Sequence, residues 1–452
     1  MLQTDAPPAL TDLADALMQA ALKAGAEAAD AMAVSGTALS IDIRQGRLEQ
    51  AERAEGTDLG LRVLIGGRQA CVSASDTAPA TLTALAERAV AMAREAPEDP
   101  TAGLADPDQL ARGWDLAALQ LEDPTEDPGA AALEAEARAL EAAALAEAGI
   151  TQAEASAVFS RRAIAICQSN GFAGAYGRTS QSRSVTAFCG SGTGMERDYA
   201  GEGRIFGADL PNAAEIGHLA ATRALGRLGA VKPPTGRFPV LFDERVAGSL
   251  IGHLLSAING SAIARGASWA RGLMGQAVLP AGLSLIEDPL RVRSPASRPF
   301  DAEGLPCRAK ALVEDGVLQS WVLDLATARK LGLASTGNAA RGPSAPPSPG
   351  LTNVELTPGQ ASRADLLAQM GTGLLVTSMI GSTINPTTGD YSRGAAGFWV
   401  EGGKISHPVN ECTIAGNLRD MLRAIIPAND ARPHLSLRVP SLLIDGMTLA
   451  GA

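Results

Sequence analysis

The sequence predicts an α+β protein: an N-terminal α/β half with helices packed on a sheet, then a C-terminal domain of mainly antiparallel sheet or partial barrel with a helix at its start. Three observations lead to this fold class. Four helix-like segments lie in the first 230 residues. Strand-like segments that end in Gly-containing turns lie between them. From about residue 235 onward, short apolar and β-branched segments between Gly and Pro predominate, as in an antiparallel sheet.

The first unit combines two helices and two strands. Apolar residues at helical spacing predict the first helix, with Thr11 as its N-cap and Gly25 just past its end. The two strands turn at Gln45-Gly46 and at Gly66-Gly67, and Asp76-Thr77 is expected to cap the second helix. The predicted elements are a helix at 12–24, strands at 39–44 and 60–65, and a helix at 79–95.

A Pro-rich, acidic segment at 96–128 separates this unit from the next. The second unit has a predicted helix at 130–148, strands at 155–167 and 183–189, and a helix at 213–228. Residues 231–236 resemble a linker. We therefore expect an N-terminal α+β unit (1–112), a central helix-strand unit that completes the N-terminal half (113–232), and a C-terminal mainly β domain (233–452).

The C-terminal domain is expected to open with a strand at 238–242 that leads into a helix at 243–258. Short strands are predicted beyond this helix, at 311–313, 373–378, 397–400 and 435–439. No period of 20 to 50 residues indicates a repeat array.

Composition excludes several classes of protein. The formal net charge is -11 and no Lys/Arg cluster is found, which disfavours a nucleic-acid partner. The start of the chain lacks a basic segment followed by an apolar one, and no apolar run is long enough to cross a membrane, so a cytoplasmic location is expected. The five cysteines form no CxxC pair, and we expect reduced, mostly structural thiols.

Three C-terminal stretches carry a resemblance to a known family. They are FDAEGLP at 300–306, ASTGN at 334–338 and GDYSRGAAGFWVEGGKISHP at 389–408. Together they resemble the TldD/PmbA family, and within it the PmbA (TldE) branch. The resemblance covers nearly the whole chain and is strongest from 300 to 420. It implies a cytoplasmic heterodimer in which a TldD-like partner supplies zinc, general base and hydrolysis, while the TldE-like subunit helps to enclose unfolded peptides.

The chain departs from this family at the metal motif. Catalytic TldD-type members carry HExxxH on a helix and a distant Cys as third zinc ligand, which leaves one zinc position open for an activated water. The matching segment here is SLIGHLLSAI at 249–258. Aligning Gly252 with the first His places His253 at the Glu and Ala257 at the second His; shifting by one places Leu254 at the base and Ile258 at the second His. Neither register gives a zinc site, so no metal is expected in this chain.

The remaining Cys, His and Gly-rich segments do not indicate a catalytic site. Cys412 is expected to fill an apolar strand position, and His218, His407 and His434 form no pair with i, i+4 spacing. The Gly-rich stretches at 190–194 and 371–373 lack a phosphate-loop pattern, and no G-x-S-x-G elbow occurs. We predict no catalytic residue. The candidates for the cleft or for peptide binding are His253, Asn338, Arg341, Asn385, Asp390 and Arg393, although Asn and Asp in such loops often only cap turns.

Two other functions remain open at this point. One is an autonomous metallopeptidase with a non-standard metal site. The other is a protein-binding regulator, which the family's association with modulation of DNA gyrase suggests. A homodimer of this chain alone is also left open, whereas neither nucleic acid nor membrane is expected as a partner.

Overall fold

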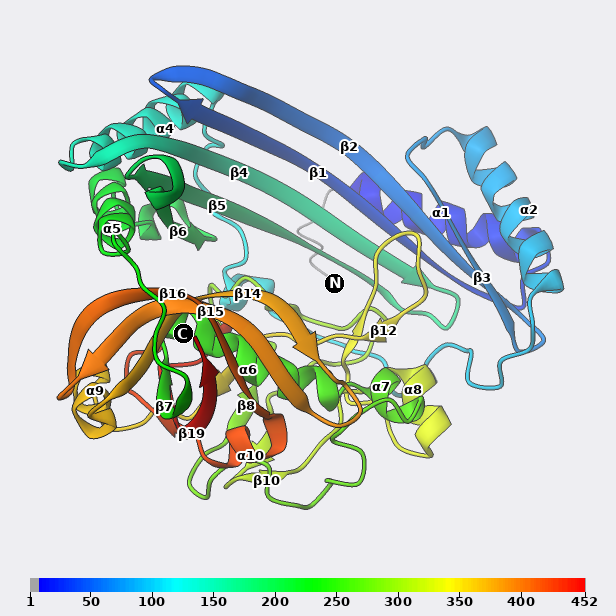
Figure 1. Ribbon diagram of the computed structural model, residues 1–452. Helices are drawn as coiled ribbons and strands as arrows, with labels where there is room; N and C mark the ends of the chain where they lie inside the picture. The colour runs from blue at the N-terminus through cyan, green and yellow to red at the C-terminus, as the bar shows by residue number, and fades with distance from the viewer. Residues whose placement is uncertain (1–7, 452) are drawn as a thin grey trace.

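The computed structural model describes residues 8–451 and shows a long curved sheet facing a compact C-terminal domain (Figure 1). The sheet has six antiparallel strands in the order β3-β2-β1-β4-β5-β6. This architecture confirms the predicted α+β class. The strands are β1 (Ala28–Arg44), β2 (Arg47–Ile65), β3 (Arg68–Ala74), β4 (Ile150–Gln168), β5 (Ala173–Cys189) and β6 (Glu196–Arg204).

Three of the four central strands, β1, β2 and β5, are far longer than the sequence predicted, whereas β4 was predicted over most of its length. β1 and β2 turn at Gln45-Gly46, where both residues have positive φ, as a two-residue hairpin requires. Their pairing then runs without interruption for most of their length, and β4 pairs with β1 from Asp30 to Arg44. Residues 47–56 of β2 are exposed on both faces. Because such a segment has no apolar alternation, the prediction found only its buried continuation at 60–65.

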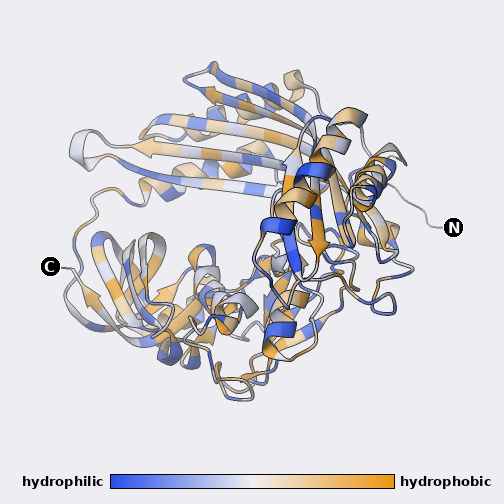
Figure 2. Ribbon diagram, turned by 90° about the vertical axis from the view of Figure 1, so that its right-hand side faces the viewer, coloured by the Kyte–Doolittle hydropathy of each residue, from blue (hydrophilic) through white to orange (hydrophobic). Residues whose placement is uncertain are grey.

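Two helix pairs cover one face of this sheet at its opposite ends (Figure 1). Ala29 and Ala31 of β1 pack with α1 (Pro8–Lys23) and α2 (Pro79–Glu95), whereas Ile41 and Ile43 pack with α4 (Ala130–Leu145). These are all odd-numbered residues and therefore point to the same face. Helix α5 (Ala213–Leu225) joins α4. Figure 2 shows the resulting alternation of polar and apolar residues along the strands.

The predicted cap of the second helix is wrong. The N-cap of α2 is Ala78, which has no side-chain hydrogen bond to the helix. Asp76 instead accepts hydrogen bonds from the backbone N–H of Ala78 and from the hydroxyl of Thr81. Pro79 at the first helical position favours the start of the helix by other means, because its fixed φ suits a helix.

The C-terminal domain is a small barrel with α6 (Glu244–Ala257) against its inner face. Its strand order is β16-β15-β14-β7-β19-β17, and an additional β16–β19 pairing closes the barrel. β14 and β7 are parallel, and the other pairs are antiparallel. The bounds are β7 (Gly236–Phe242), β14 (Gly373–Ile384), β15 (Asp390–Glu401), β16 (Lys404–Asn417), β17 (Ile426–Pro427) and β19 (Leu442–Ala450).

The helix predicted at 243–258 is confirmed as α6. Asp243 accepts a hydrogen bond from the N–H of Arg245 as the N-cap, and Leu250, Ile251 and Leu254 are fully buried in the barrel core. Helix α9 (Arg363–Met370) covers the opposite face of the same sheet. A second, five-stranded sheet completes the domain with β8 (Leu285–Glu287), β9 (Lys310–Glu314), β10 (Val317–Leu318), β13 (Val354–Leu356) and β18 (Leu437–Arg438).

Short elements complete the description. They are α3 (Leu116–Leu119), α7 (Gly260–Ala264), α8 (Leu325–Leu331), α10 (Leu418–Arg423), two 3-10 turns at Gly192–Gly194 and Gly207–Asp209, and the two-residue strands β11 (Ala339–Ala340) and β12 (Ser348–Pro349). None of the helices within residues 8–451 has the length and apolar character of a membrane-spanning segment.

An aromatic cluster docks the C-terminal domain beneath the sheet. The Phe300 side chain is 1% exposed, and its ring lies 4.8 Å from Trp114, 5.0 Å from Phe172 and 5.5 Å from Tyr176, each in an edge-to-face arrangement. Gly174 on β5 makes room for this ring, since a Cβ there would stand 2.7 Å from Phe300. A side chain at Gly174 would therefore push the two halves apart.

The turn that follows Phe300 is fixed by buried carboxyl groups. Asp301 accepts hydrogen bonds from the backbone N–H groups of Glu303, Leu305 and Ala339. Glu303 accepts one from the N–H of Leu325 at the start of α8. Burial, reinforced by the negative charge of Asp301, raises the pKa of Glu303 to about 8. Glu303 is therefore mainly protonated at neutral pH.

We predict that Glu303→Gln removes a pH-dependent loss of stability. In the unfolded chain Glu303 ionises from about pH 4.5, whereas the folded protein holds the proton up to about pH 8, so the wild-type stability falls between these values. One pKa unit corresponds to about 1.4 kcal/mol. From about pH 5 to about pH 8, the free energy of unfolding of the variant should therefore rise by more than ~1 kcal/mol relative to that of the wild type.

Urea unfolding at about pH 5 and at about pH 8 measures this gain. Because the change in unfolding free energy between the two pH values is compared, any pH-independent packing cost of the glutamine side chain in the variant Glu303→Gln cancels. The exposed Glu314 offers a matched control, Glu314→Gln, which should follow the wild-type profile. Parallel profiles for wild type and Glu303→Gln would contradict the prediction.

Candidate functional site

A cleft of about 820 Å³ lies where the edge of the N-terminal sheet meets α6. The N-terminal wall comes from the start of β6 and the turn before it, including Met195, Asp198 and Tyr199. The C-terminal wall comes from Arg245 and Ser249 of α6 and from residues 377–380 of β14. The cleft therefore joins segments that lie almost 200 residues apart in the sequence.

The edge of β14 is open along this cleft. β7 pairs with β14 only at Leu374 to Val376, and β15 occupies the other side of β14. From Thr377 to Ile384, no strand within residues 8–451 pairs with the remaining edge. Two register shifts interrupt the β15 pairing in this segment, and bulges of this kind redirect a strand at a sheet edge. Unpaired backbone groups along an edge can accept an added strand.

Exposed apolar side chains surround this edge. Ile380 is 74% exposed, Tyr199 59% and Met195 57%, and all three line the cleft. Large apolar side chains that are gathered in one concave region mark an interaction site more often than isolated ones do. The combination of an open strand edge and apolar side chains suits an extended polypeptide.

An ion-pair network fixes the two walls of the cleft. Arg245 at the start of α6 contacts Asp198 of β6 at 3.0 Å and Asp243 at 3.4 Å. Arg227 also contacts Asp198, at 3.4 Å, and Glu196, at 3.5 Å. The side chains of Asp198 and Arg245 are mostly buried, which favours a defined geometry over a mobile surface contact.

The structure brings together two of the predicted site residues, His253 and Arg393, near the β14 end of the cleft. The His253 ring lies 5.9 Å from that of Tyr391, and Arg393 donates to the carbonyl oxygen of Gly381 at 2.7 Å. Burial, and then the charge of Arg393, lower the pKa of His253. Its buried Nε2 has no hydrogen-bond partner among the described residues. His253 is thus a neutral, half-buried ring at neutral pH.

Tyr391 is a packing residue beneath this histidine. It is 2% exposed, and its hydroxyl donates to the sulfur of Met379 at 3.4 Å. Burial raises the pKa of Tyr391 to about 12, so its phenol stays protonated.

The residues of α6 do not fit a zinc ion. His253 is the only histidine on the helix, and the positions three and four residues away hold Ser249, Leu250, Ser256 and Ala257, none of which is a usual zinc ligand. Cys412 is buried on β16 and its thiol donates to the carbonyl oxygen of Ala395 at 3.2 Å. Within residues 8–451, no group of three or more His, Cys, Asp or Glu side chains could hold a metal ion. Catalytic zinc sites require three protein ligands.

Asn385 and Asp390 lie together in the turn between β14 and β15. Asn385 accepts hydrogen bonds from the N–H groups of Thr387 and Thr388. Asp390 accepts from the hydroxyl of Thr388 at 2.6 Å and from the amide of Asn417 at 3.1 Å. These bonds lower the pKa of the exposed Asp390. Both side chains therefore serve the turn itself, in the way such residues commonly do.

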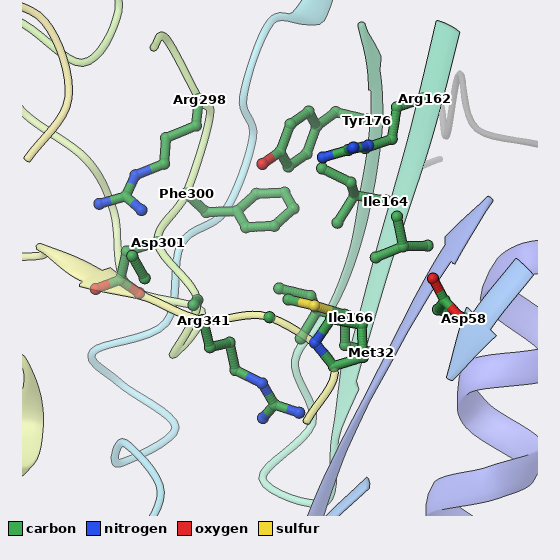
Figure 3. A pocket seen from close by; sticks show the side chains of 15 residues that line it. Met32, Asp58, Arg162, Ile164, Ile166, Tyr176, Arg298, Phe300, Asp301 and Arg341 are labelled. Atoms are coloured by element: carbon green, nitrogen blue, oxygen red, sulfur yellow. The ribbon is translucent and has the colours of Figure 1, made fainter. Parts of the chain in front are cut away.

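Asn338 and Arg341 lie elsewhere in the C-terminal domain. The Asn338 amide donates to both carboxylate oxygens of the buried Glu287, at 2.9 and 3.0 Å, and so supports the second sheet. Arg341 forms an ion pair with Asp30 of β1 and lines a different, smaller cavity (Figure 3). The six candidates thus occupy four separate places.

The remaining histidines and cysteines have local partners. His218 lies 2.7 Å from Glu147 on the surface, and His434 lies 2.9 Å from Glu202. None of the five cysteines forms a disulfide within residues 8–451.

The residues that shape the cleft most carry no recognisable signal in the sequence. Ile380, Tyr199 and Asp198 lie on strands whose extent or existence was not predicted, and no motif marks them. Only the position of Arg245 could be inferred locally, because Asp-Glu-Arg at 243–245 begins a predicted helix and so places Arg245 in its first turn. Even there, the partner Asp198 could not be inferred, since the pairing depends on how the two halves dock.

Comparisons with known proteins agree with this architecture. Models of the PmbA/TldA metallopeptidase match its domain 1 at residues 29–93, its central domain at 117–228 and its C-terminal domain at 235–451. The chain is 37% identical to metalloprotease PmbA of Escherichia coli O157:H7, over 92% of this chain and 90% of that protein. Haemophilus influenzae has a PmbA homologue (34%, covering 96% and 94%) and a TldD homologue (28%, covering 58% of each chain).

Solved structures show the same fold. A candidate modulator of DNA gyrase from Bacteroides thetaiotaomicron superimposes with a TM-score of 0.92 at 26% identity, covering 99% of this chain and all of that one. TldE from Thermococcus kodakarensis superimposes with a TM-score of 0.84 at 19% identity, covering 97% and 100%. With all three domains matched and a relative of 37% identity over most of its length, this chain belongs to the PmbA/TldD metallopeptidase family.

Proposed function

We propose that this protein is the non-catalytic, TldE-like subunit of a cytoplasmic heterodimeric zinc metallopeptidase. A TldD-like partner supplies the zinc, the general base and the hydrolytic step. This chain supplies part of the chamber and holds an unfolded peptide in the cleft along α6. The single observation that supports this most is the open β14 edge beside a helix whose residues do not fit zinc.

Strand addition suits a peptidase that must accept many sequences. Backbone hydrogen bonds to the edge from Thr377 to Ile380 would hold any extended peptide, because they do not depend on its side chains. Met195, Tyr199 and Ile380 would contact apolar side chains on either side of that strand. Folded proteins would be excluded, since their backbone groups are already paired.

The partner is inferred from the family. One organism, Haemophilus influenzae, has both a PmbA homologue and a TldD homologue that resemble this chain. The absence of a fitting ligand set on α6 gives a chemical reason for a second subunit, because a peptidase of this family needs an activated water.

A regulator that binds a protein such as DNA gyrase is the alternative. The name of a structural relative as a candidate gyrase modulator supports it. The net charge of -11 is compatible with a protein target and disfavours DNA itself. Gyrase supercoiling that changes on addition of this chain alone would favour this alternative.

Reconstitution with a TldD-like partner tests the main proposal. We expect neither subunit alone to cleave an unfolded peptide, and the mixture to do so in a species with the mass of one of each. Elemental analysis should find zinc in the partner and none held stoichiometrically by this chain, and a chelator should abolish cleavage. Chelator-sensitive cleavage by this chain alone, after removal of contaminating partner, would instead support an autonomous peptidase.

We predict that His253→Ala leaves the assembled complex with most of its turnover. His253 is half-buried and neutral at neutral pH, and no partner group within the described residues orients it for proton transfer. Removal of a general base costs on the order of a hundredfold or more in kcat. A decrease below about fivefold is therefore expected, whereas a thousandfold loss with the complex intact would assign His253 a direct role.

We predict that Ile380→Glu weakens peptide binding. The side chain is 74% exposed in the cleft, so the substitution should not disturb folding but would place a charge beside the open strand edge. KM for an apolar unfolded peptide should rise about tenfold with kcat little changed. Ile405→Glu, at an exposed position on β16 outside the cleft lining, is the matched control. Equal KM values for the two variants would contradict the assignment.

A further inference from the structure

The α6 cleft carries more positive than negative charge, although the chain as a whole is acidic. Four arginines line the cleft, against the two carboxylates of Glu196 and Asp198. The formal net charge of the chain is -11. A cleft lined with one sign of charge concentrates the electric field inside it. The surplus of positive charge is therefore a property of this cleft, and it acts on whatever lies within it.

Two of the four arginines are neutralised by ion pairs. Arg227 and Arg245 share Asp198 in the network that fixes the walls of the cleft. Arg363 joins this network through Asp243, at 2.9 Å, so that three arginines face three carboxylates. The network as a unit is neutral. The surplus charge lies on the other two arginines of the lining, which are Arg197 and Arg393.

Arg197 stands on the N-terminal wall of the cleft. It is exposed on β6, the edge strand of the sheet, and it makes no ion pair with any residue that the structure describes. Ala200 of the same strand packs with α5, so Arg197 and Tyr199 point to the opposite face, because side chains alternate along a strand. Met195 and Tyr199, both exposed, lie on either side of Arg197 along the chain. A charged group thus stands between two apolar ones.

Arg393 stands on the C-terminal wall. Its Nε donates to the carbonyl oxygen of Gly381 at 2.7 Å, which holds the side chain against the part of β14 that has the open edge. Its guanidinium forms no ion pair with a carboxylate within residues 8–451. The neighbouring His253 is neutral at neutral pH, because burial and Arg393 itself lower its pKa. The positive charge of Arg393 is therefore uncompensated within the described chain.

We propose that the α6 cleft selects extended peptides in which acidic side chains adjoin apolar ones. This inference rests on the peptide-binding function proposed above and specifies its substrate class. A guanidinium matches the two oxygens of a carboxylate, and Arg197 and Arg393 offer one such group on each wall. The open edge of β14 binds the peptide backbone, the exposed apolar residues take apolar side chains, and the two arginines choose among sequences by charge.

Three labelled peptides test this selectivity on the isolated full chain. Each has the form Gly-Ser-Val-X-X-Val-Ser-Gly with blocked ends, where X is Glu, Gln or Lys. Adjacent residues of an extended peptide point to opposite faces, so one X can reach each wall. At about 50 mM salt, fluorescence anisotropy should show the Glu peptide binding at least about fivefold more tightly than the Gln peptide, and the Lys peptide at least about fivefold more weakly. At about 0.5 M salt these ratios should fall below about twofold.

Charge reversal assigns the selectivity to Arg197. Arg197→Glu should lower the ratio of Glu-peptide to Lys-peptide affinity at least about tenfold, because one wall then repels the acidic peptide and attracts the basic one. Arg308→Glu is the matched control, since it makes the same change in net charge at an exposed arginine outside the cleft lining. Its ratio should stay within about threefold of the wild type.

Two substitutions separate the charge of Arg393 from its contact with Gly381. Arg393→Gln should reduce the preference for the Glu peptide about fivefold. Arg393→Lys keeps the charge and should retain most of that preference. Affinity for the Gln peptide should change by less than about twofold in both variants, which shows that the open edge of β14 is intact. Thermal unfolding verifies the fold of each variant.

Equal affinity for the three peptides at low salt overturns the inference and leaves the proposed peptide-binding function standing. A preference for the Lys peptide, or a preference for the Glu peptide that neither Arg197→Glu nor Arg393→Gln reduces, overturns it as well. If none of the peptides binds at protein concentrations up to about 1 mM, the inference and the peptide-binding role of this cleft are both wrong.

Discussion

The insertion of Phe300 beneath the N-terminal sheet is the contact on which the arrangement of the two halves depends. Its ring is enclosed by three aromatic rings of the N-terminal half. Asp301 then binds three backbone N–H groups and fixes the chain that follows. The FDAEGLP signature therefore joins domains, and the α6 cleft and the cavity beside Arg341 both lie between the halves that it holds together.

Helix α6 keeps its place in the fold although its residues do not fit a zinc ion. Asp243 still caps the helix, and the apolar face of the helix still fills the barrel core. On the cleft side, His253 remains as a neutral ring against Tyr391. The proposed binding of a polypeptide rests on the open edge of β14 and on its exposed apolar neighbours.

Buried ion pairs join distant segments of the chain in two places. Asp198 of β6 contacts Arg245 of α6 and Arg227, and Arg227 also contacts Glu196. Beneath the sheet, the buried Asp30 of β1 is shared by Arg62 of β2 and Arg341 of the C-terminal domain. Both sets of ion pairs therefore add to the contacts between the two halves of the molecule.

The sequence by itself determined the fold class, the position of α6 and the lack of a zinc motif on it, because caps, helical periodicity and ligand spacing are local properties. It could not determine the length of β1, β2 and β5, since their exposed or small side chains become strands only through pairing with neighbours. Nor could it separate Arg341 from Arg393, because each acquires its surroundings from a different docking of the two halves. Tertiary structure alone decided which polar residues of the signature stretches support turns and which face a cavity.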